Sequence, residues 1–358
     1  MDGLPARPRT QDLPADLDLI ADRVEERVDA LLAAETSRWS SVDPDLVEPL
    51  EALRGLVMAG GKRLRPAFCH WGFVAAGGDP RDLRVVQAGA AFELFQAFAL
   101  IHDDIMDGSA VRRGSPAVHR RFEGDHHHRS WHGEARRFGE GVAILIGDLA
   151  LIYADMLLPS GPPVLLALWD ELRVELNMGQ YLDLVGTAAG GVDRAGARRI
   201  ALLKSGRYTI ERPLQLGALL AGGREMANDL SLYGDPLGQA FQLRDDVLGA
   251  FGEADRTGKP VGEDLREGKP TLLLAVATET AEGSDAALLE QVGDPDLGPE
   301  VIAELQDLLV RSGALGVMEA EIAGLANVAV DALSTISLPD SARIALEDLA
   351  EFVVARDG

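Results

Sequence analysis

The sequence predicts an all-α protein, and three observations support that fold class. Hydrophobic residues make up 47% of the 358 residues, with alanine and leucine throughout, whereas aromatic residues make up only 5%. Apolar residues such as Leu17, Ile20, Val24 and Val28 recur at three- and four-residue spacing, the period of an amphipathic helix. Runs of valine, isoleucine and tyrosine at the two-residue period of strands are scarce.

The predicted helices follow one another without a linker that would divide the chain. Residues 1–14 hold three prolines and are expected to be a flexible tail before a single all-helical domain over 15–358. Residues 108–140 are polar and are expected to form a long loop containing at most a short helix. Helices are expected at 16–34, 46–59, 82–107, 141–158, 163–188, 193–220 and 225–253, and from 270 to 355 with a loop at 293–299.

Charge and cysteine content restrict the partners and the compartment. A formal net charge of −24 argues against nucleic acid or an anionic membrane surface as a partner. The single cysteine, Cys69, fits a reducing compartment, and the first residues lack the apolar core of a signal peptide. The apolar stretch 142–158 is interrupted by Asp148 and Asp155, so no membrane span is expected. We expect a cytoplasmic protein.

The segment LIHDDIMDGSAVRRG carries the strongest chemical signal. Asp103 and Asp107 lie one helical turn apart with Asp104 beside them, and carboxylates this close repel one another unless a cation binds. Mg²⁺ is the cation that best suits such a set of hard oxygen ligands. Arg112 and Arg113 would then face an anion that the metal also holds, and a phosphate group is the obvious choice. A solvated acidic helix end is the alternative, but the apolar residues before the cluster indicate a buried helix.

A second aspartate pair occurs in FQLRDDVLGAFGE. Asp245 and Asp246 again follow an apolar helix, and the glycine-rich segment beyond them holds Lys259 and Lys269. Two solvated helix ends of this kind would be a coincidence. We therefore expect the two clusters to be halves of one metal site.

The motif GGKRLRP is a candidate anion site. Its paired glycines permit a tight turn, from which Lys62, Arg63 and Arg65 extend. A helix terminator with a solvated basic turn is the alternative, and the acidic composition of the chain favours the anion site.

Two further stretches, a glycine-containing break in a helical pattern and a group of histidines, have unusual composition. Lys204, Ser205 and Gly206 interrupt a helical pattern, so we expect a kink that turns backbone carbonyls toward a cavity, unless the helix merely tolerates poor helix formers. The histidines of the polar stretch have no cysteine partner and no helical ligand spacing, so we expect solvated side chains and no zinc site. They are His126, His127, His128 and His132.

At these residues the sequence resembles the trans-isoprenyl diphosphate synthases, the polyprenyl synthetase family. Five motifs match in order: GGKRLRP, DDIMD with RRG, GQYLDL, KSGRYT, and FQLRDD with TGK and a later lysine. The resemblance implies an isoprenoid-synthase-type helical bundle around a deep central cavity, assembled as a homodimer. It also implies a Mg²⁺-dependent prenyltransferase that condenses isopentenyl diphosphate with allylic diphosphates, head to tail and in the E configuration.

The resemblance implies a role for each matched residue, with about three Mg²⁺ ions per active site. The implied metal ligands are Asp103, Asp104, Asp107, Asp245 and Asp246. The implied contacts of the allylic diphosphate are Arg112, Lys204, Gln242 and Lys259, with Lys269 and Ser205, which stands where the family usually has threonine. The implied contacts of isopentenyl diphosphate are Lys62, Arg65, Gln96 and Arg113. The catalytic groups would be Asp103, Asp104, Lys204 and Asp245.

One position departs from the family pattern. Gly249 stands where the second cluster more often has a third aspartate, which is expected to loosen one metal or alter the affinity for the allylic substrate. Asp245, Asp246 and Gln242 remain, so the departure does not argue for an inactive protein.

By family analogy, bulk below the first cluster sets the product length. Phe98 lies five residues before Asp103, about 7 Å deeper along the helix, with Phe95 further down. One bulky residue at that place resembles synthases of geranylgeranyl diphosphate, the expected product, and farnesyl diphosphate is the alternative. Both phenylalanines could instead be ordinary core residues.

Three other functions compete with a prenyltransferase. A metal-dependent phosphohydrolase would use His102 and Asp103 with a second histidine near His70, and would leave Lys62 and Arg113 unexplained. A terpene cyclase would need an N-D-x-x-S-x-x-x-E-like motif, which does not follow Asp245. A regulatory subunit would be expected to lack the first aspartate cluster, which is intact.

Overall fold

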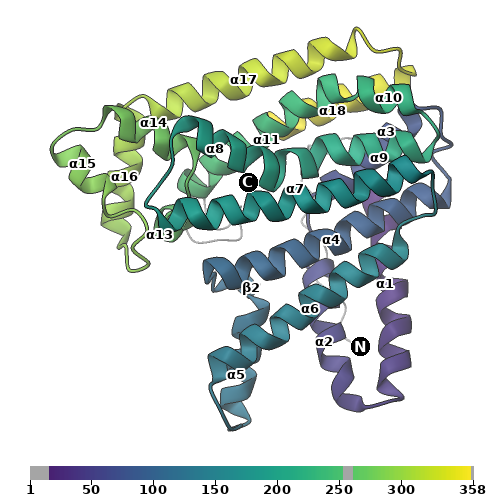
Figure 1. Ribbon diagram of the computed structural model, residues 1–358, viewed down its shortest axis with the longest axis horizontal. Coiled ribbons are helices and arrows are strands. Elements are labelled where there is room, and N and C mark those ends of the chain that lie inside the picture. The colour runs from purple at the N-terminus through teal and green to yellow at the C-terminus, as the bar shows by residue number, and fades with distance from the viewer. Residues whose placement is uncertain (1–15, 253–260, 356–358) are drawn as a thin grey trace.

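The protein is built almost entirely from helices (Figure 1), which confirms the predicted all-α class. The computed structural model describes residues 16–252 and 261–355, so the predicted tail over 1–14 lies outside the described residues. The helices of the first half are α1 (Leu17–Ser40), η1 (Pro44–Leu46), α2 (Val47–Met58), α3 (Leu64–Ala75), α4 (Leu83–Asp107), α5 (Val118–His128), α6 (Ala135–Leu157) and α7 (Pro163–Ala188). Those of the second half are α8 (Arg194–Ala201), η2 (Leu202–Glu211), α9 (Arg212–Leu220), α10 (Arg224–Asp229), α11 (Ser231–Phe251), α13 (Glu263–Glu267), α14 (Leu272–Thr280), α15 (Ser284–Leu289), α16 (Pro299–Arg311), α17 (Ala314–Leu333) and α18 (Asp340–Ala355).

Helix α4 lies at the centre of the fold and carries the first aspartate cluster at its carboxyl end. It begins at the N-cap Asp82, whose side chain accepts a hydrogen bond from the Arg84 amide, and ends at Gly108, which has a φ of 70°. Among the described residues it is long and apolar enough to cross a membrane, as is the bent pair α16 and α17 taken together. Since 72% of its apolar window is buried inside the fold, the apolar character of α4 is that of a core helix.

The segment 108–140 is more ordered than the sequence suggested. A hairpin of β1 (Val111–Arg112) and β2 (Ser115–Pro116) follows α4, and α5 and the start of α6 occupy most of the rest. The prediction of a long loop with a short helix was therefore wrong. Helix α5 buries Val118, Phe122 and His126, which recur every four residues, so packing against α6 outweighed the polar composition.

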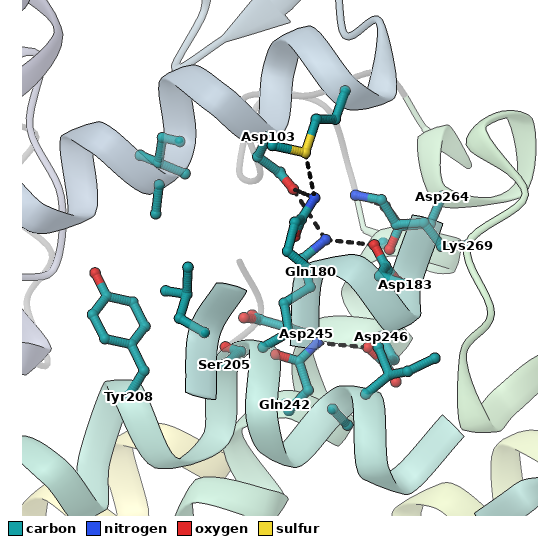
Figure 2. A pocket seen from close by; sticks show the side chains of 18 of the residues that line it. Asp103, Gln180, Asp183, Ser205, Tyr208, Gln242, Asp245, Asp246, Asp264 and Lys269 are labelled. Atoms are coloured by element: carbon teal, nitrogen blue, oxygen red, sulfur yellow. Dashed lines mark hydrogen bonds and ion pairs between the residues drawn. The ribbon is translucent and has the colours of Figure 1, made fainter. Parts of the chain in front are cut away.

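The interruption at Lys204 is a change of helix type. Between α8 and α9 the chain forms a continuous π-helix, η2, over ten residues, in place of the expected kink. A Cβ at Gly206 would lie 2.9 Å from the Gly238 carbonyl oxygen, and one at Gly238 would lie 2.5 Å from that of Gly206. The two glycines therefore let η2 approach α11 closely, which brings Ser205 beside Gln242 in Figure 2.

Candidate active site

A cavity of about 530 Å³ lies between α4, α7, η2 and α11. Both aspartate clusters contribute to its lining, through Asp103 on α4 and through Asp245 and Asp246 on α11. Figure 2 shows Asp103 across the cavity from Gln242 and the second aspartate pair. Asp103 therefore shares one space with Asp245 and Asp246, although Asp103 and Asp245 are 142 residues apart in the sequence.

The first acidic wall, Asp103, Asp104 and Asp107, is balanced by basic side chains. Asp103 Oδ1 lies 3.0 Å from Lys204 Nζ and accepts a hydrogen bond of 3.0 Å from the Gln180 amide. Burial of Asp103 opposes its ionisation, but the charges of Lys204, Lys269 and Arg112 outweigh burial and hold its pKa well below the usual range. Asp103 is therefore ionised at neutral pH.

Asp104 and Asp107 do not line the cavity. Asp104 is buried and its Oδ1 accepts hydrogen bonds from Arg112, at 2.8 Å from Nε and a second from Nη2. Asp107 Oδ2 lies 3.3 Å from Lys269 Nζ, and burial of the carboxyl raises its pKa to about 6. Their roles as metal ligands stay predictions. To bind a metal, Asp104 would have to release Arg112 and Asp107 would have to release Lys269.

The β1–β2 hairpin positions the two arginines. Its two-residue loop consists of Arg113 and Gly114, with φ of 52° and 71°, and turns of this type need the left-handed conformation that glycine adopts readily. Arg112 extends toward the first wall and Arg113 toward the GGKRLRP turn, where its Nη1 donates 2.8 Å to the Leu56 carbonyl. Burial, together with nearby arginines, lowers the pKa of Arg113 to about 10.

Two residues of α7 contact Asp103 and its partner Lys204. Asp183 Oδ2 accepts a hydrogen bond of 2.6 Å from Lys204 Nζ, and Gln180 holds Asp103. Both residues belong to the motif GQYLDL, and neither was predicted to be part of the site. The sequence offers no separate signal for Asp183, because its burial on the same helix as Glu175 and Gln180 follows from packing.

The second acidic wall is Asp245 and Asp246 on α11. Gln242 Nε2 donates 2.8 Å to Asp246 Oδ1, so the amide that the sequence predicted for substrate binding also orients this carboxyl. Burial raises the pKa of Asp246 to about 8, and the neighbouring charges of Asp264, Asp245 and Asp183 act in the same direction. This wall therefore has an excess of negative charge.

Lys269 lies between the walls. Its ammonium nitrogen is 2.9 Å from Glu267 Oε2, 3.3 Å from Asp107 Oδ2 and 3.6 Å from Asp264 Oδ1. Burial opposes protonation of Lys269, but these carboxylates raise its pKa well above the usual value. The predicted contact Lys259 lies outside the described residues.

The opposite end of the cavity is basic and polar. Arg65 stacks over the Tyr208 ring at 4.2 Å and donates 2.7 Å to Thr209 Oγ1. The Tyr208 hydroxyl donates 2.6 Å to Gln96 Oε1, so the Gln96 amide nitrogen is left to donate elsewhere. Lys62, Arg65, Gln96 and Arg113 all line this part of the cavity, and Tyr208 was missed by the sequence reasoning.

Arg63 differs from its two basic neighbours in the GGKRLRP turn. Its guanidinium is buried, pairs with Glu25 and Glu93, and donates to the Val57 carbonyl. Arg63 is therefore part of the core, and only Lys62 and Arg65 of the predicted cluster face the cavity.

The apolar part of the cavity lies along α4 below Asp103. Phe98 lines it and stacks on Phe95, with ring centroids 5.4 Å apart, whereas Phe95 is fully buried behind it. The His102 ring lies 4.8 Å from that of Phe98, and a Cβ at Gly147 of α6 would lie 2.3 Å from His102 Nε2. Gly147 therefore makes room for the His102 imidazole between α4 and α6.

The histidines that a hydrolase or a zinc site would need are not gathered. His70 is buried on α3, does not line the cavity, and burial lowers its pKa to about 4. His126 is also buried, against Phe138, and its Nε2 lies 3.1 Å from the His132 carbonyl, so the expectation that it is solvated was wrong. Across the described ranges, no three histidine, cysteine or carboxylate side chains stand at distances that would hold a metal ion.

The donor chemistry of the cavity nevertheless suits Mg²⁺. The cavity is lined by carboxylates from α4, α7, α11 and α13, and burial together with neighbouring carboxylates raises the pKa of Asp246. Lys204 and Lys269 pair with Asp103 and Asp107 of the first wall, so binding a divalent ion there requires these lysine side chains to shift.

Comparison with known proteins gives one consistent family. A polyprenyl synthetase family profile matches residues 48–309. The crystal structure of a geranylgeranyl pyrophosphate synthase from Corynebacterium glutamicum, complexed with isoprenyl diphosphate and magnesium, superposes with a TM-score of 0.90 at 36% identity, covering 95% of this chain and 99% of that one. The all-helical isoprenoid synthase fold is thereby confirmed.

Curated relatives agree on the family and differ in product. A short chain isoprenyl diphosphate synthase from Methanothermobacter thermautotrophicus is 33% identical over 89% of this chain and 93% of its own length. A (2E,6E)-farnesyl diphosphate synthase from Mycobacterium tuberculosis is 31% identical over 83% of this chain and 80% of its own length. These names therefore leave the chain length of the product open.

Proposed function

The chain belongs to the polyprenyl synthetase family and is a prenyl transferase, and from this premise we propose that it makes geranylgeranyl diphosphate. The enzyme would add isopentenyl diphosphate to allylic diphosphates, head to tail and with E geometry, and residues 15–358 would act as one catalytic domain in the cytoplasm. Farnesyl diphosphate is the alternative product.

One observation carries the proposal: two carboxylate walls and a set of buried cations face one cavity whose deep end is apolar. Mg²⁺, when bound, would neutralise the allylic diphosphate and favour its departure. Asp103, Asp245 and Asp246 would hold it from two sides, and Asp104 and Asp107 would complete the first wall once their basic partners shift. About three ions would satisfy this set.

The cations of the cavity would bind and orient the two substrates. Arg112, Lys204, Lys269 and Gln242 lie near the acidic walls, with Ser205 beside them, and suit the allylic diphosphate. Lys62, Arg65, Gln96 and Arg113 lie at the basic end and suit isopentenyl diphosphate. Two substrates held in this way would meet beside the apolar part of the cavity, where water is excluded and the allylic cation is protected.

Phe98 would set the chain length by closing the cavity below Asp103. Its ring lines the space and is braced by Phe95 from behind, so the pair would act as a floor. The position of this floor, one turn and a half below the carboxylates, supports a C20 product, and a shorter C15 product would require a higher floor.

Exposed apolar residues support a homodimer. They recur at helical spacing on α6 and on α7, and α4 runs between these two helices in the view of Figure 1. The most exposed of these side chains are Leu145, Ile152, Met156, Met178 and Tyr181. Light scattering should give about 76 kDa, twice the chain mass of 38.2 kDa, and Tyr181→Glu should shift this toward the monomer. A monomeric wild type would reject the dimer.

Chromatography of products tests the function itself. The purified chain would be incubated with labelled isopentenyl diphosphate, Mg²⁺ and C5, C10 or C15 allylic primers. We expect a C20 diphosphate from each primer and none without Mg²⁺. Release of phosphate from the primer without a longer chain would favour a phosphohydrolase, and accumulation at C15 would favour a farnesyl diphosphate synthase.

A further inference from the structure

Gly249 leaves a specific space in the second wall. It lies four residues after Asp245, one helical turn along the same face of α11, as Asp107 follows Asp103 on α4. A carboxylate at 249 would complete the second cluster in the way that Asp107 completes the first. Glycine has no side chain there, so the position is open to a neighbour.

The side chain of Asp264 occupies that space. A Cβ built on Gly249 would lie 1.7 Å from Asp264 Oδ2 and 2.3 Å from Asp264 Cγ. Asp264 comes from α13, on the other side of the segment that follows α11, and it lines the same cavity as Asp245 and Asp246. Figure 2 shows it close to Lys269 and on the side of Asp246.

The contacts of Asp264 leave its carboxylate suited to a cation from the cavity. Its described ion pair is with Lys269, at 3.6 Å, whereas Lys269 lies closer to Glu267 and Asp107. Lys269 therefore keeps two partners if Asp264 turns to another cation. Among neighbouring carboxylates, Asp264 exerts the strongest repulsion on Asp246, which places its charge beside that pair.

We propose that Asp264 supplies, from α13, the third carboxylate that the second cluster lacks at Gly249, and that it completes the Mg²⁺ site of this wall. The inference rests on the proposed function, since it names a residue of the same site. A carboxylate from a neighbouring helix would thus replace one that the motif itself omits.

Ion binding without turnover tests this assignment. Mn²⁺ uptake would be followed by electron paramagnetic resonance in the presence of inorganic pyrophosphate. Asp264→Ala should weaken one class of bound Mn²⁺ by about tenfold or more. Asp285→Asn is the control, because Asp285 is a carboxylate that pairs with Arg311 and does not line the cavity, so Mn²⁺ uptake should not change.

A positional exchange makes the test specific. Gly249→Asp alone should lower the melting temperature, because the new side chain collides with Asp264. Asp264→Ala removes the colliding carboxylate and leaves only its own Cβ, 3.1 Å from a Cβ at position 249. The double variant Gly249→Asp with Asp264→Ala should therefore restore Mn²⁺ affinity to within about threefold of wild type.

Several outcomes would overturn the assignment. The assignment would be overturned if Asp264→Ala bound Mn²⁺ as tightly as wild type. It would also be overturned if the double variant bound Mn²⁺ no better than Asp264→Ala. If the double variant does not fold, Asp264→Asn, which keeps the size of the side chain, must weaken Mn²⁺ by itself. A wild-type protein that takes up no Mn²⁺ with pyrophosphate would instead refute the proposed function and this inference with it.

Discussion

The two acidic walls share a sequence pattern but differ in charge balance. On α4, Asp103 and Asp104 are paired with Lys204 and Arg112, and the pKa of Asp103 is low. On α11, Asp246 is held by an amide among other carboxylates, and burial raises its pKa to about 8. Asp103 on the first wall is therefore ionised before any metal arrives, whereas a cation beside Asp246 on the second wall would favour its ionisation.

The largest expected effect of breaking this pattern is at Asp103. Asp103→Ala removes the ionised carboxylate that lines the cavity and leaves Lys204 with Asp183 alone, so turnover should fall by about 10³-fold. Steady-state rates with a C15 primer provide the measurement, and circular dichroism checks the fold. Near-normal condensation by a folded variant would contradict the role of the first wall.

The basic end should respond differently from either wall. Arg113→Ala should raise KM for isopentenyl diphosphate by about 10- to 100-fold while KM for the allylic primer stays within about twofold, because the guanidinium lies away from the carboxylates. Initial rates with each substrate varied in turn separate the two constants. An unchanged KM for isopentenyl diphosphate would reject the assignment of Arg113.

The floor below the first wall should control product length. Phe98→Ala should extend the main product by at least one isoprene unit, because it opens the cavity toward Phe95. Phe95→Leu is the matched comparison: it keeps the lining ring of Phe98 and should shift the product less. Product chromatography reads both, and an unaltered length in Phe98→Ala would leave Phe98 as an ordinary core residue.

The smallest effect, and the one that separates the walls most sharply, concerns metal-free stability. Because the pKa of Asp246 is raised in the fold, its carboxyl favours the folded state fully only below about pH 4, and this contribution is lost as pH rises through about 8. Asp246→Asn cannot ionise, so it should melt roughly 5 °C above wild type at pH 8. The low pKa of Asp103 has the opposite sign, so Asp103→Asn should melt below wild type at pH 8.

Thermal scans in chelator between pH 5 and pH 8 would show the difference. The difference between Asp246→Asn and wild type should shrink as pH falls from 8 to 5, because the cost of keeping Asp246 protonated in the fold decreases toward its unfolded pKa. Shifts of the same sign for both variants at pH 8 would remove the proposed contrast between the walls.

Much of the fold and of the site follows from local pattern. The apolar run of α4 and its DDIMD end, and the later FQLRDD, predict two buried helices with carboxylates at their ends. Residues named from these motifs, such as Lys204 and Gln242, line one cavity in the structure. Their roles in binding stay predictions that the variants above would test.

What the sequence did not predict depends on packing between distant segments. Helix α5 is polar by composition and forms because a few apolar positions meet α6. Asp264 reaches the second wall only because Gly249 leaves room, a relation that neither motif contains alone. Arg63 looked like its basic neighbours, and only the burial of Glu93 on α4 shows that it belongs to the core.

A double-variant cycle tests most directly whether both walls serve one ligand. Mn²⁺ affinity in the presence of pyrophosphate would be measured for wild type, Asp103→Asn, Asp246→Asn and the combined variant. A shared site predicts that the combined loss differs from the sum of the single losses by more than about 1 kcal/mol. Losses that add to within about 0.5 kcal/mol would show two independent sites and contradict the account.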